Sequence, residues 1–234
     1  MNQYQADRVR ALRIAALLSV ALVAGLLLPS AQASYMGVLV STDLGLLATG
    51  NWLYAGETKI EWNVFQNPDN SWHYSYLFSH PEGQTSHFIL ETSLNFSSGD
   101  VLNPEGHFGG FDVGWQPANP GSPFMPEAVY GIRFEPMTGV ATAINFDTWR
   151  VPVWGDFYAK DGAPGGHGHA TARNAGFTLN DWDPTVPAQN GSVENHILVP
   201  DTDVSTVPEP SVMILLGVGL AGAGLYRRLR KPTR

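Results

Sequence analysis

Apolar and polar residues alternate with a period of two through the middle of the chain. In the stretch SWHYSYLFSHP, Trp72, Tyr74, Tyr76 and Phe78 fall on one face, and His73, Ser75 and Ser79 fall on the other. Successive side chains of a strand point to opposite faces, whereas a helix repeats its apolar positions every three to four residues. The pattern therefore predicts a β-strand with one buried face.

Two other stretches alternate in the same way, SHFILETSLNF and AVYGIRFEP. The first places four apolar residues on one predicted face, namely Phe88, Leu90, Leu94 and Phe96. Weaker candidates of the same kind are TKIEWNVF, GFDVGW, ATAINFDTW, VPVWGDFYA and HILV. Turn signals rich in Pro, Gly, Asn and Asp separate them, for example at residues 103–106 (NPEG).

Helical periodicity is weak between residues 34 and 199. Only TDLGLLATGNWLYAG is ambiguous, and its glycines argue against a long helix. Short strands with frequent Gly and Pro turns predict an all-β ectodomain over residues 34–199, an antiparallel β-sandwich of the jelly-roll kind. A short polar connector over residues 200–206 follows it.

The N-terminal region has the plan of a secretory signal peptide. Three arginines precede a 15-residue apolar run from Ile14 to Leu28, and the small residues Ala31 and Ala33 follow. A charged region, a short apolar region and an A-x-A site are the three parts of such a signal. We expect cleavage after residue 33, which leaves Ser34 as the new N-terminus; the alternative is an uncleaved N-terminal anchor.

A second apolar run lies near the other end of the chain, over the 15 uncharged residues 212–226. As a helix it would be about 22 Å long, shorter than the roughly 30 Å hydrocarbon core of a bilayer. The basic residues that follow it are Arg227, Arg228, Arg230 and Lys231. Basic residues stay on the cytoplasmic side, so the pattern predicts a marginal inner-membrane span with a stop signal behind it.

Charge is unevenly distributed along the chain. Residues 34–206 hold 19 acidic and five basic residues, a net charge of −14, whereas the whole chain has −8. Such an acidic region repels nucleic acid and anionic lipid headgroups, so we expect no nucleic-acid partner. The basic residues of both ends belong inside the cell and the acidic middle outside. The absence of cysteine excludes a thiolate nucleophile and thiolate metal ligands.

Metal-ligating residues occur in two short motifs. Asp181 and Asp183 are paired carboxylates in DWDP, and calcium prefers clustered oxygens. His167 and His169 in GGHGH are two apart and could share a metal, although two ligands are fewer than a zinc site needs. Solvated loop residues are the alternative for both motifs, so we expect no obligate cofactor and keep calcium as a weaker hypothesis.

Catalytic signatures such as Gly-x-Ser-x-Gly, His-Glu-x-x-His and the P-loop are missing. A carbohydrate-active enzyme would need two carboxyl groups facing one cleft, drawn from Glu82, Glu91, Asp112 or Asp156. Aromatic faces also stack on sugars, and most tryptophans of a sandwich belong to its core. Three that border turn-rich segments are candidates for a surface carbohydrate contact: Trp115, Trp154 and Trp182.

The C-terminal region resembles a PEP-CTERM sorting signal. It has the motif Val207-Pro208-Glu209-Pro210-Ser211, then the apolar run, then the basic cluster, over residues 207–231. The resemblance implies export in a Gram-negative bacterium and recognition by an exosortase, a membrane transpeptidase that removes the tail near this motif. It also implies an association with exopolysaccharide and biofilm.

These patterns together favour a non-enzymatic protein of the cell surface or extracellular matrix. The protein is expected to be held in the inner membrane by its tail before processing and then displayed or released. Two alternatives stay open: a secreted carbohydrate-active enzyme, and a single-span membrane protein whose tail is never cut.

Overall fold

A computed structural model describes residues 33–162 and 169–200 of the protein. The chain divides into two compact units, Met1–Ala33 and Ser34–Arg234. This division coincides with the predicted signal cleavage site, and the first strand begins at Ser34. The signal peptide, the connector and the tail, as predicted above, lie outside the described residues apart from Ala33 and Pro200, so cleavage and membrane insertion stay predictions.

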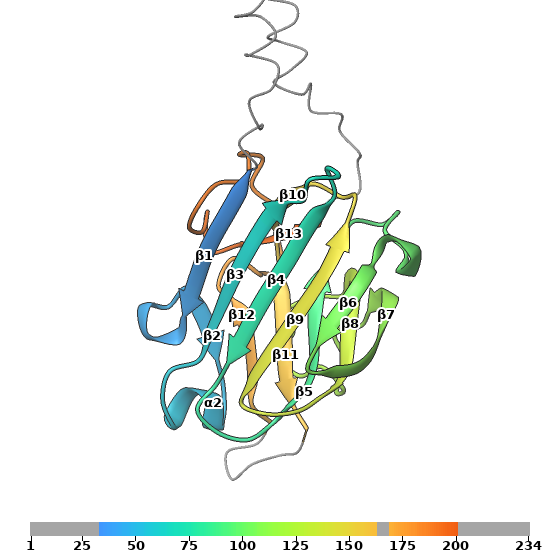
Figure 1. The fold of residues 1–234 in the computed structure, drawn as a ribbon. Coiled ribbons are helices and arrows are strands. Elements are labelled where there is room, and N and C mark those ends of the chain that lie inside the picture. The colour runs from blue at the N-terminus through green and yellow to red at the C-terminus, as the bar shows by residue number, and fades with distance from the viewer. Residues whose placement is uncertain (1–32, 163–168, 201–234) are drawn as a thin grey trace, which may run out of the picture. The chain divides into compact units, whose positions relative to one another are not determined.

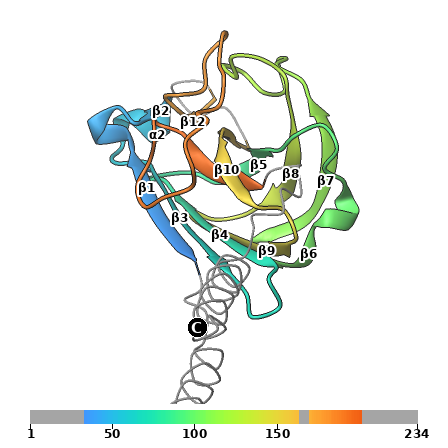
Figure 2. The same ribbon diagram turned by 90° about the horizontal axis from the view of Figure 1, so that it is seen from above.

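The described residues of the second unit form antiparallel sheets in a sandwich-like arrangement (Figures 1 and 2). The five-stranded sheet has the order β1 (Ser34–Val40), β3 (Lys59–Gln66), β4 (Trp72–Ser79), β9 (Ala141–Thr148) and β6 (Leu102–Gly106). The six-stranded sheet has the order β2 (Leu46–Ala48), β12 (Thr171–Asn174), β11 (Phe157–Asp161), β5 (Thr85–Glu91), β8 (Val129–Met137) and β7 (Phe108–Gln116). A small sheet pairs β10 (Pro152–Gly155) with β13 (Ile197–Pro200).

Helix is scarce in the part of the chain that the structure describes. It consists of the single-turn helix α2 (Asn51–Tyr54) and the 3₁₀ turns η1 (Ser41–Asp43) and η2 (Ser98–Asp100). Helix α2 lies in the one stretch whose pattern was ambiguous. The prediction of an all-β, antiparallel, sandwich-like domain is confirmed, and its jelly-roll character stays a prediction.

The core lies between the two large sheets and is built mainly of aromatic rings. The predicted apolar face of β4 is buried, with Tyr74, Tyr76 and Phe78 no more than 1% exposed. The Tyr74 ring stacks on Phe146 of β9 at 5.4 Å between ring centroids, and Phe78 lies 6.0 Å from Phe88 of β5. Aromatic side chains bury large apolar areas, so the Phe78–Phe88 contact helps to hold the two large sheets together, while the Tyr74–Phe146 contact joins neighbouring strands of one sheet.

Strand β5 is buried on both faces, which the simple alternation did not predict. Ile89 points away from the central core and is 1% exposed, because it packs against a second cluster completed by Met125, Val129, Tyr158 and Phe177. Segments beyond the strands thus cover the outer face of the six-stranded sheet.

Two local predictions were wrong. Leu94, expected in the core, is 66% exposed, because β5 ends at Glu91 although the apolar alternation of the sequence continues beyond it. Residues 103–106, expected as a turn, belong to β6, whose pairing with β9 is irregular between Leu102 and Glu105. Strand β6 lies at the sheet edge, where the proline of this segment is tolerated because a ladder hydrogen bond is not required on the open side.

Candidate functional site

The pairing of β10 with β13 brings an aspartate and a histidine together at one end of the small sheet. Gly155 lies opposite Ile197 in this antiparallel ladder, so the next residue of one strand meets the preceding residue of the other. These residues are Asp156 and His196, both only 2% exposed. Nε2 of His196 lies 3.8 Å from Oδ1 of Asp156.

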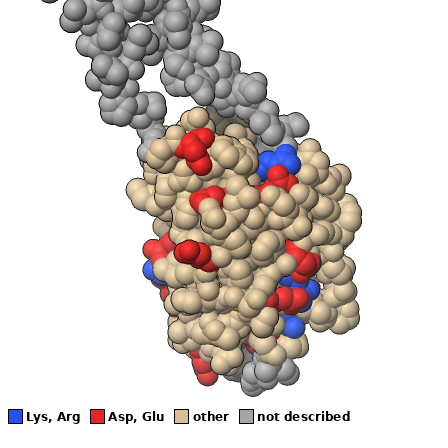
Figure 3. Space-filling model, turned by 45° about the vertical axis from the view of Figure 1, so that its right-hand side comes forward, with Lys and Arg blue, Asp and Glu red and all other residues tan. Residues whose placement is uncertain are grey.

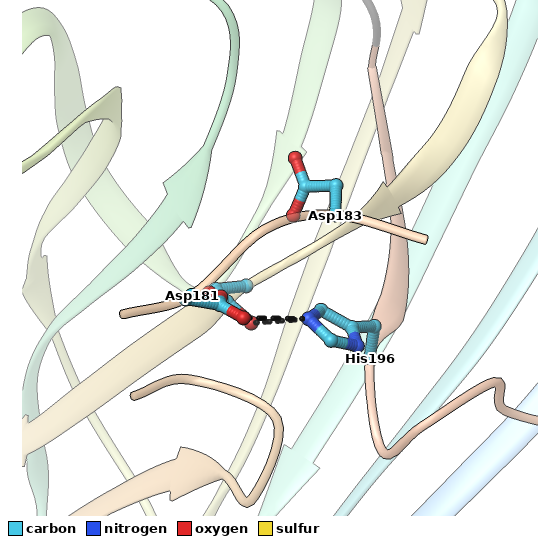
Figure 4. Close-up of side chains that lie close together, drawn as sticks. Asp181, Asp183 and His196 are labelled. Atoms are coloured by element: carbon cyan, nitrogen blue, oxygen red, sulfur yellow. Dashed lines mark hydrogen bonds and ion pairs between the residues drawn. The ribbon is translucent and has the colours of Figure 1, made fainter. Parts of the chain in front are cut away.

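The segment between β12 and β13 adds two carboxylates to this pair. Asp181 and Asp183 come from the DWDP motif, and Oδ1 of Asp181 lies 3.3 Å from Nε2 of His196 (Figure 4). One potential ligand atom from each of Asp156, Asp181, Asp183 and His196 lies within 4.8 Å of every other. These four residues are called the Asp₃His cluster below. It is buried on the Asp156 side and exposed at Asp183.

The imidazole of His196 is fixed from its far side. Its Nδ1 lies 3.2 Å from the backbone carbonyl of Val193, which can only accept, so Nδ1 donates this hydrogen bond. A Cβ at Gly176 would lie 2.7 Å from Cε1 of His196, so the lack of a side chain there leaves room for the ring. Nε2 is therefore directed at the carboxylates.

Asp156 lies in a network of buried polar groups. Its carboxylate accepts a hydrogen bond from the side-chain amide of Asn174, and its backbone N–H donates to Glu91 Oε2 at 2.9 Å. Burial raises the pKa of Asp156 well above its usual range, and a hydrogen bond with Asp181 and the charge of Glu91 add to this. Burial also raises the pKa of Glu91, and the charge of Asp183 adds to the effect. Both shifts come from placing several acids together away from water.

A cavity of about 310 Å³ adjoins the cluster. Its wall includes the carboxylates of Glu91, Glu127 and Asp183 and the aromatic residues Trp115 and Tyr130. The side chain of Trp115 is 63% exposed, and its ring meets the ring of Tyr130 edge-on at 5.9 Å. The cavity therefore combines an exposed aromatic face with acidic groups.

Thr92 also lines this cavity and is 4% exposed. Its hydroxyl has no hydrogen-bond partner among the described residues. Buried polar groups usually have a partner, because an unpaired one costs on the order of 1–3 kcal/mol. The unpaired hydroxyl marks the cavity as a place where a polar ligand or a bound water would be stabilised.

The other predicted metal pair, His167 and His169, stays a prediction. His169 is paired with Asp161, with 3.0 Å between Nδ1 and Oδ1, and His167 lies outside the described residues. Of the three tryptophans expected to contact carbohydrate, Trp115 and Trp182 are exposed at 63% and 65%. Trp154 is 0% exposed, so that part of the prediction is corrected: its ring belongs to the core and cannot form a surface platform.

The four carboxylates considered for catalysis are distributed over the domain. Glu91 and Asp156 lie together. Glu82 is in the turn before β5, where its backbone carbonyl accepts a hydrogen bond from Trp52 at 3.0 Å. Asp112 is on β7 and accepts a hydrogen bond from the Gln116 amide at 3.2 Å.

Acidic groups also dominate elsewhere on the surface. Figure 3 shows separate patches of acidic side chains on one face of the described domain, with fewer basic groups beside them. Three of the five basic residues are held in ion pairs: Arg150 with Asp100 at 3.0 Å, Lys59 with Glu61 at 3.0 Å and Arg133 with Glu135 at 2.7 Å. The acidic character expected from the sequence therefore remains at the surface.

Comparison with known proteins identifies the tail. A family model for the PEP-CTERM protein-sorting motif matches residues 206–231. The chain therefore carries a PEP-CTERM signal, which implies an exported protein that crosses the membrane and is sorted by an exosortase. No curated protein and no solved structure matches the chain. Over residues 33–162 and 169–200, no helix has both the length and the apolarity to cross a bilayer.

His196 was not recognised from the sequence, and Asp156 was considered only as a catalytic acid. The two lie 40 positions apart, and no short motif joins them. They meet only through the pairing of β10 with β13. The DWDP motif was the one local signal for this site.

Proposed function

We propose that the protein is a non-enzymatic component of the cell surface or extracellular matrix that associates with exopolysaccharide. An N-terminal signal exports the acidic domain, and the C-terminal tail holds it in the inner membrane until an exosortase removes the tail. The PEP-CTERM match at residues 206–231 is the observation that carries this proposal.

The composition of the tail fits transient anchoring. Residues 212–226 are short for a bilayer span, and four glycines within them lower helix propensity by on the order of 1 kcal/mol each. Pro208 and Pro210 disfavour continuation of a helix, because proline lacks a backbone N–H and restricts the residue before it. Glu209 would then lie in an extended segment that a membrane enzyme can bind.

Replacing Pro208, Glu209 and Pro210 by alanine tests the role of the tail. The variant should remain full length in the inner membrane, while the wild-type protein becomes shorter and leaves that fraction. Immunoblots of fractionated cells with an internal tag measure both changes. The matched control is Pro232→Ala, which removes a proline outside the matched segment and should be processed like wild type.

Equal size and equal fractionation of the wild-type protein and the triple variant would contradict the proposal. That result would favour the alternative in which the tail is a permanent anchor.

The cavity beside β7 supports polysaccharide as the partner of the folded domain. Trp115 presents an exposed ring, and Glu91, Glu127 and Asp183 provide hydrogen-bond acceptors for sugar hydroxyls. Few polar groups beside an aromatic face are typical of small-molecule sites. The Asp156 carboxyl is buried and bonded to an amide, so it is poorly placed to reach a glycosidic bond, and binding is favoured over hydrolysis.

A glycan array and a hydrolysis screen on the purified protein test this part. Trp115→Ala should reduce retention of bound polysaccharide at least tenfold, because it removes the stacking face. Trp149→Ala is the matched control, since Trp149 is also exposed, at 52%, but does not line the cavity. Turnover of a polysaccharide that Glu91→Gln abolishes would contradict a binding role and favour the enzyme alternative.

A further inference from the structure

We propose that the Asp₃His cluster binds one divalent transition-metal ion of the Zn²⁺ or Mn²⁺ class. The inference does not depend on tail processing or on polysaccharide binding. It rests on four donors from three separate segments, on the orientation of the histidine ring, and on an unpaired hydroxyl in the adjoining cavity.

The candidate ligand atoms already lie close to the spacing that ligands of one metal ion have. Zinc–ligand bonds of about 2.0–2.1 Å place tetrahedral ligands roughly 3.3 Å apart. Nε2 of His196 lies 3.3 Å from Asp181 and 3.8 Å from Asp156, and all four candidate ligand atoms lie within 4.8 Å of one another. A shift of side chains by less than about 1 Å would close the set around one ion.

The histidine has the outer contact that metal-bound histidines usually have. In such sites the second ring nitrogen donates to a carbonyl or carboxylate, which fixes the tautomer and points the free nitrogen at the metal. Nδ1 of His196 donates to the carbonyl of Val193, so in the neutral ring Nε2 carries the lone pair. Nε2 forms a hydrogen bond with Oδ1 of Asp181 at 3.3 Å and lies 3.8 Å from Oδ1 of Asp156. A cation bound between these atoms would replace that hydrogen bond and take the ring nitrogen and both carboxyl groups as common ligands.

Thr92 provides evidence from outside the cluster. Its hydroxyl is buried and has no hydrogen-bond partner among the described residues, and Thr92 and Asp183 line the same cavity. Water that completes the coordination of a metal from this cavity would give the hydroxyl a partner. Asp183 is the exposed member of the set, so it also marks the route by which an ion could enter.

The imidazole decides the class of metal. Calcium takes six to eight oxygen ligands, whereas imidazole suits transition metals. From the paired aspartates alone, calcium was the weaker hypothesis beside the expectation of no obligate cofactor. The presence of His196 favours a metal that accepts mixed nitrogen and oxygen ligands.

Isothermal titration calorimetry on the full-length protein, purified in mild detergent and stripped with EDTA, tests the proposal with ZnCl₂, MnCl₂ and CaCl₂. Wild type should bind one Zn²⁺ or Mn²⁺ per chain, more tightly than Ca²⁺. Asp183→Asn should weaken this binding at least tenfold, and because Asp183 is exposed, the variant should keep the fold. His196→Gln should weaken Zn²⁺ binding and reduce the preference over Ca²⁺.

The matched controls are Asp112→Asn and His169→Gln, which remove the same groups outside the cluster and should bind metal like wild type. Thermal unfolding confirms that each variant is folded, and mass spectrometry of metal content checks the stoichiometry. Absence of Zn²⁺ and Mn²⁺ binding by the folded wild type would overturn the site. Equal binding by wild type and Asp183→Asn would also overturn it, and tighter binding of Ca²⁺ would overturn the assigned metal class.

Discussion

Replacement of His87 should make the stability of the domain less sensitive to acid. His87 lies on β5 and is 1% exposed, with its Nδ1 3.4 Å from Nη2 of Arg133 on β8. Arginine can only donate, so the ring is neutral with its proton on Nε2, which has no hydrogen-bond partner among the described residues. Lys160 of β11 lies opposite His87 in the sheet, and the Tyr158 ring is 5.9 Å away.

These surroundings oppose protonation of His87. Burial, together with the positive charges of Arg133 and Lys160, lowers the pKa of His87 from 6.5 to about 3. Glu135 does not offset this, because it is paired with Arg133 at 2.7 Å.

The sign of the effect on stability follows from proton linkage. Above pH 6.5 His87 is neutral in both states, and its contribution to stability is fully present. As the pH falls from 6.5 toward 3, the unfolded chain binds a proton that the folded domain excludes, so stability decreases. A pH of 5 lies about 1.5 units below the unfolded-state pKa of 6.5. The free energy of unfolding is therefore about 2 kcal/mol lower at pH 5 than at pH values well above 6.5.

Urea unfolding followed by tryptophan fluorescence at pH 7 and pH 5 measures this effect. His87→Asn removes the titrating ring and keeps an acceptor near Arg133. The variant should be less stable than wild type at pH 7, but its loss between pH 7 and pH 5 should be smaller by about 2 kcal/mol. The lowered pKa of the buried His80 acts in the same direction in both proteins, so it cancels in the comparison.

His107→Asn is the control, because His107 is exposed and lies outside this contact. Equal losses of unfolding free energy between pH 7 and pH 5 in wild type and His87→Asn would show that protonation of His87 does not contribute to the acid sensitivity.

Two further substitutions test the packing of the sandwich by urea midpoints. A Cβ at Gly37 would lie 2.1 Å from the Trp62 ring, so Gly37→Ala should destabilise the domain by about 1–3 kcal/mol. Gly114→Ala is the control, because no atom lies within 4 Å of the added Cβ, and it should change stability little. Similar midpoints for both variants would show that the contact with Trp62 relaxes freely. The Tyr76 hydroxyl donates to the carbonyl of Leu198 at 2.7 Å, so Tyr76→Phe should cost about 1 kcal/mol, and an unchanged midpoint would mean that this buried bond adds nothing.

The sequence predicted the strands whose alternation is complete, and it was least reliable where local composition resembles a turn. Strand β4 carries an unbroken aromatic face, and the structure buries it. Strand β6 contains Pro and Gly and was predicted as a turn, because its place at a sheet edge is set by pairing with β9 and not by its own residues. Leu94 shows the opposite case, in which an apolar alternation continues beyond the end of its strand.

The candidate site could be predicted only in part, because it depends on distant pairing. Asp181 and Asp183 are close in sequence, so their proximity was visible in the DWDP motif. Asp156 and His196 are joined by the register of β10 on β13, for which local periodicity gives no signal. The difference matters chemically, because paired aspartates alone suggest calcium as a weaker hypothesis, whereas an imidazole beside them favours a transition metal.

The exported and processed state is the central claim, and intact-mass spectrometry of the protein recovered from its host tests it most directly. We expect a chain that begins at Ser34 and ends near the motif Pro208-Glu209-Pro210, without the apolar and basic residues of the tail. A recovered chain that still contains residues 212–231 in every cell fraction would contradict it.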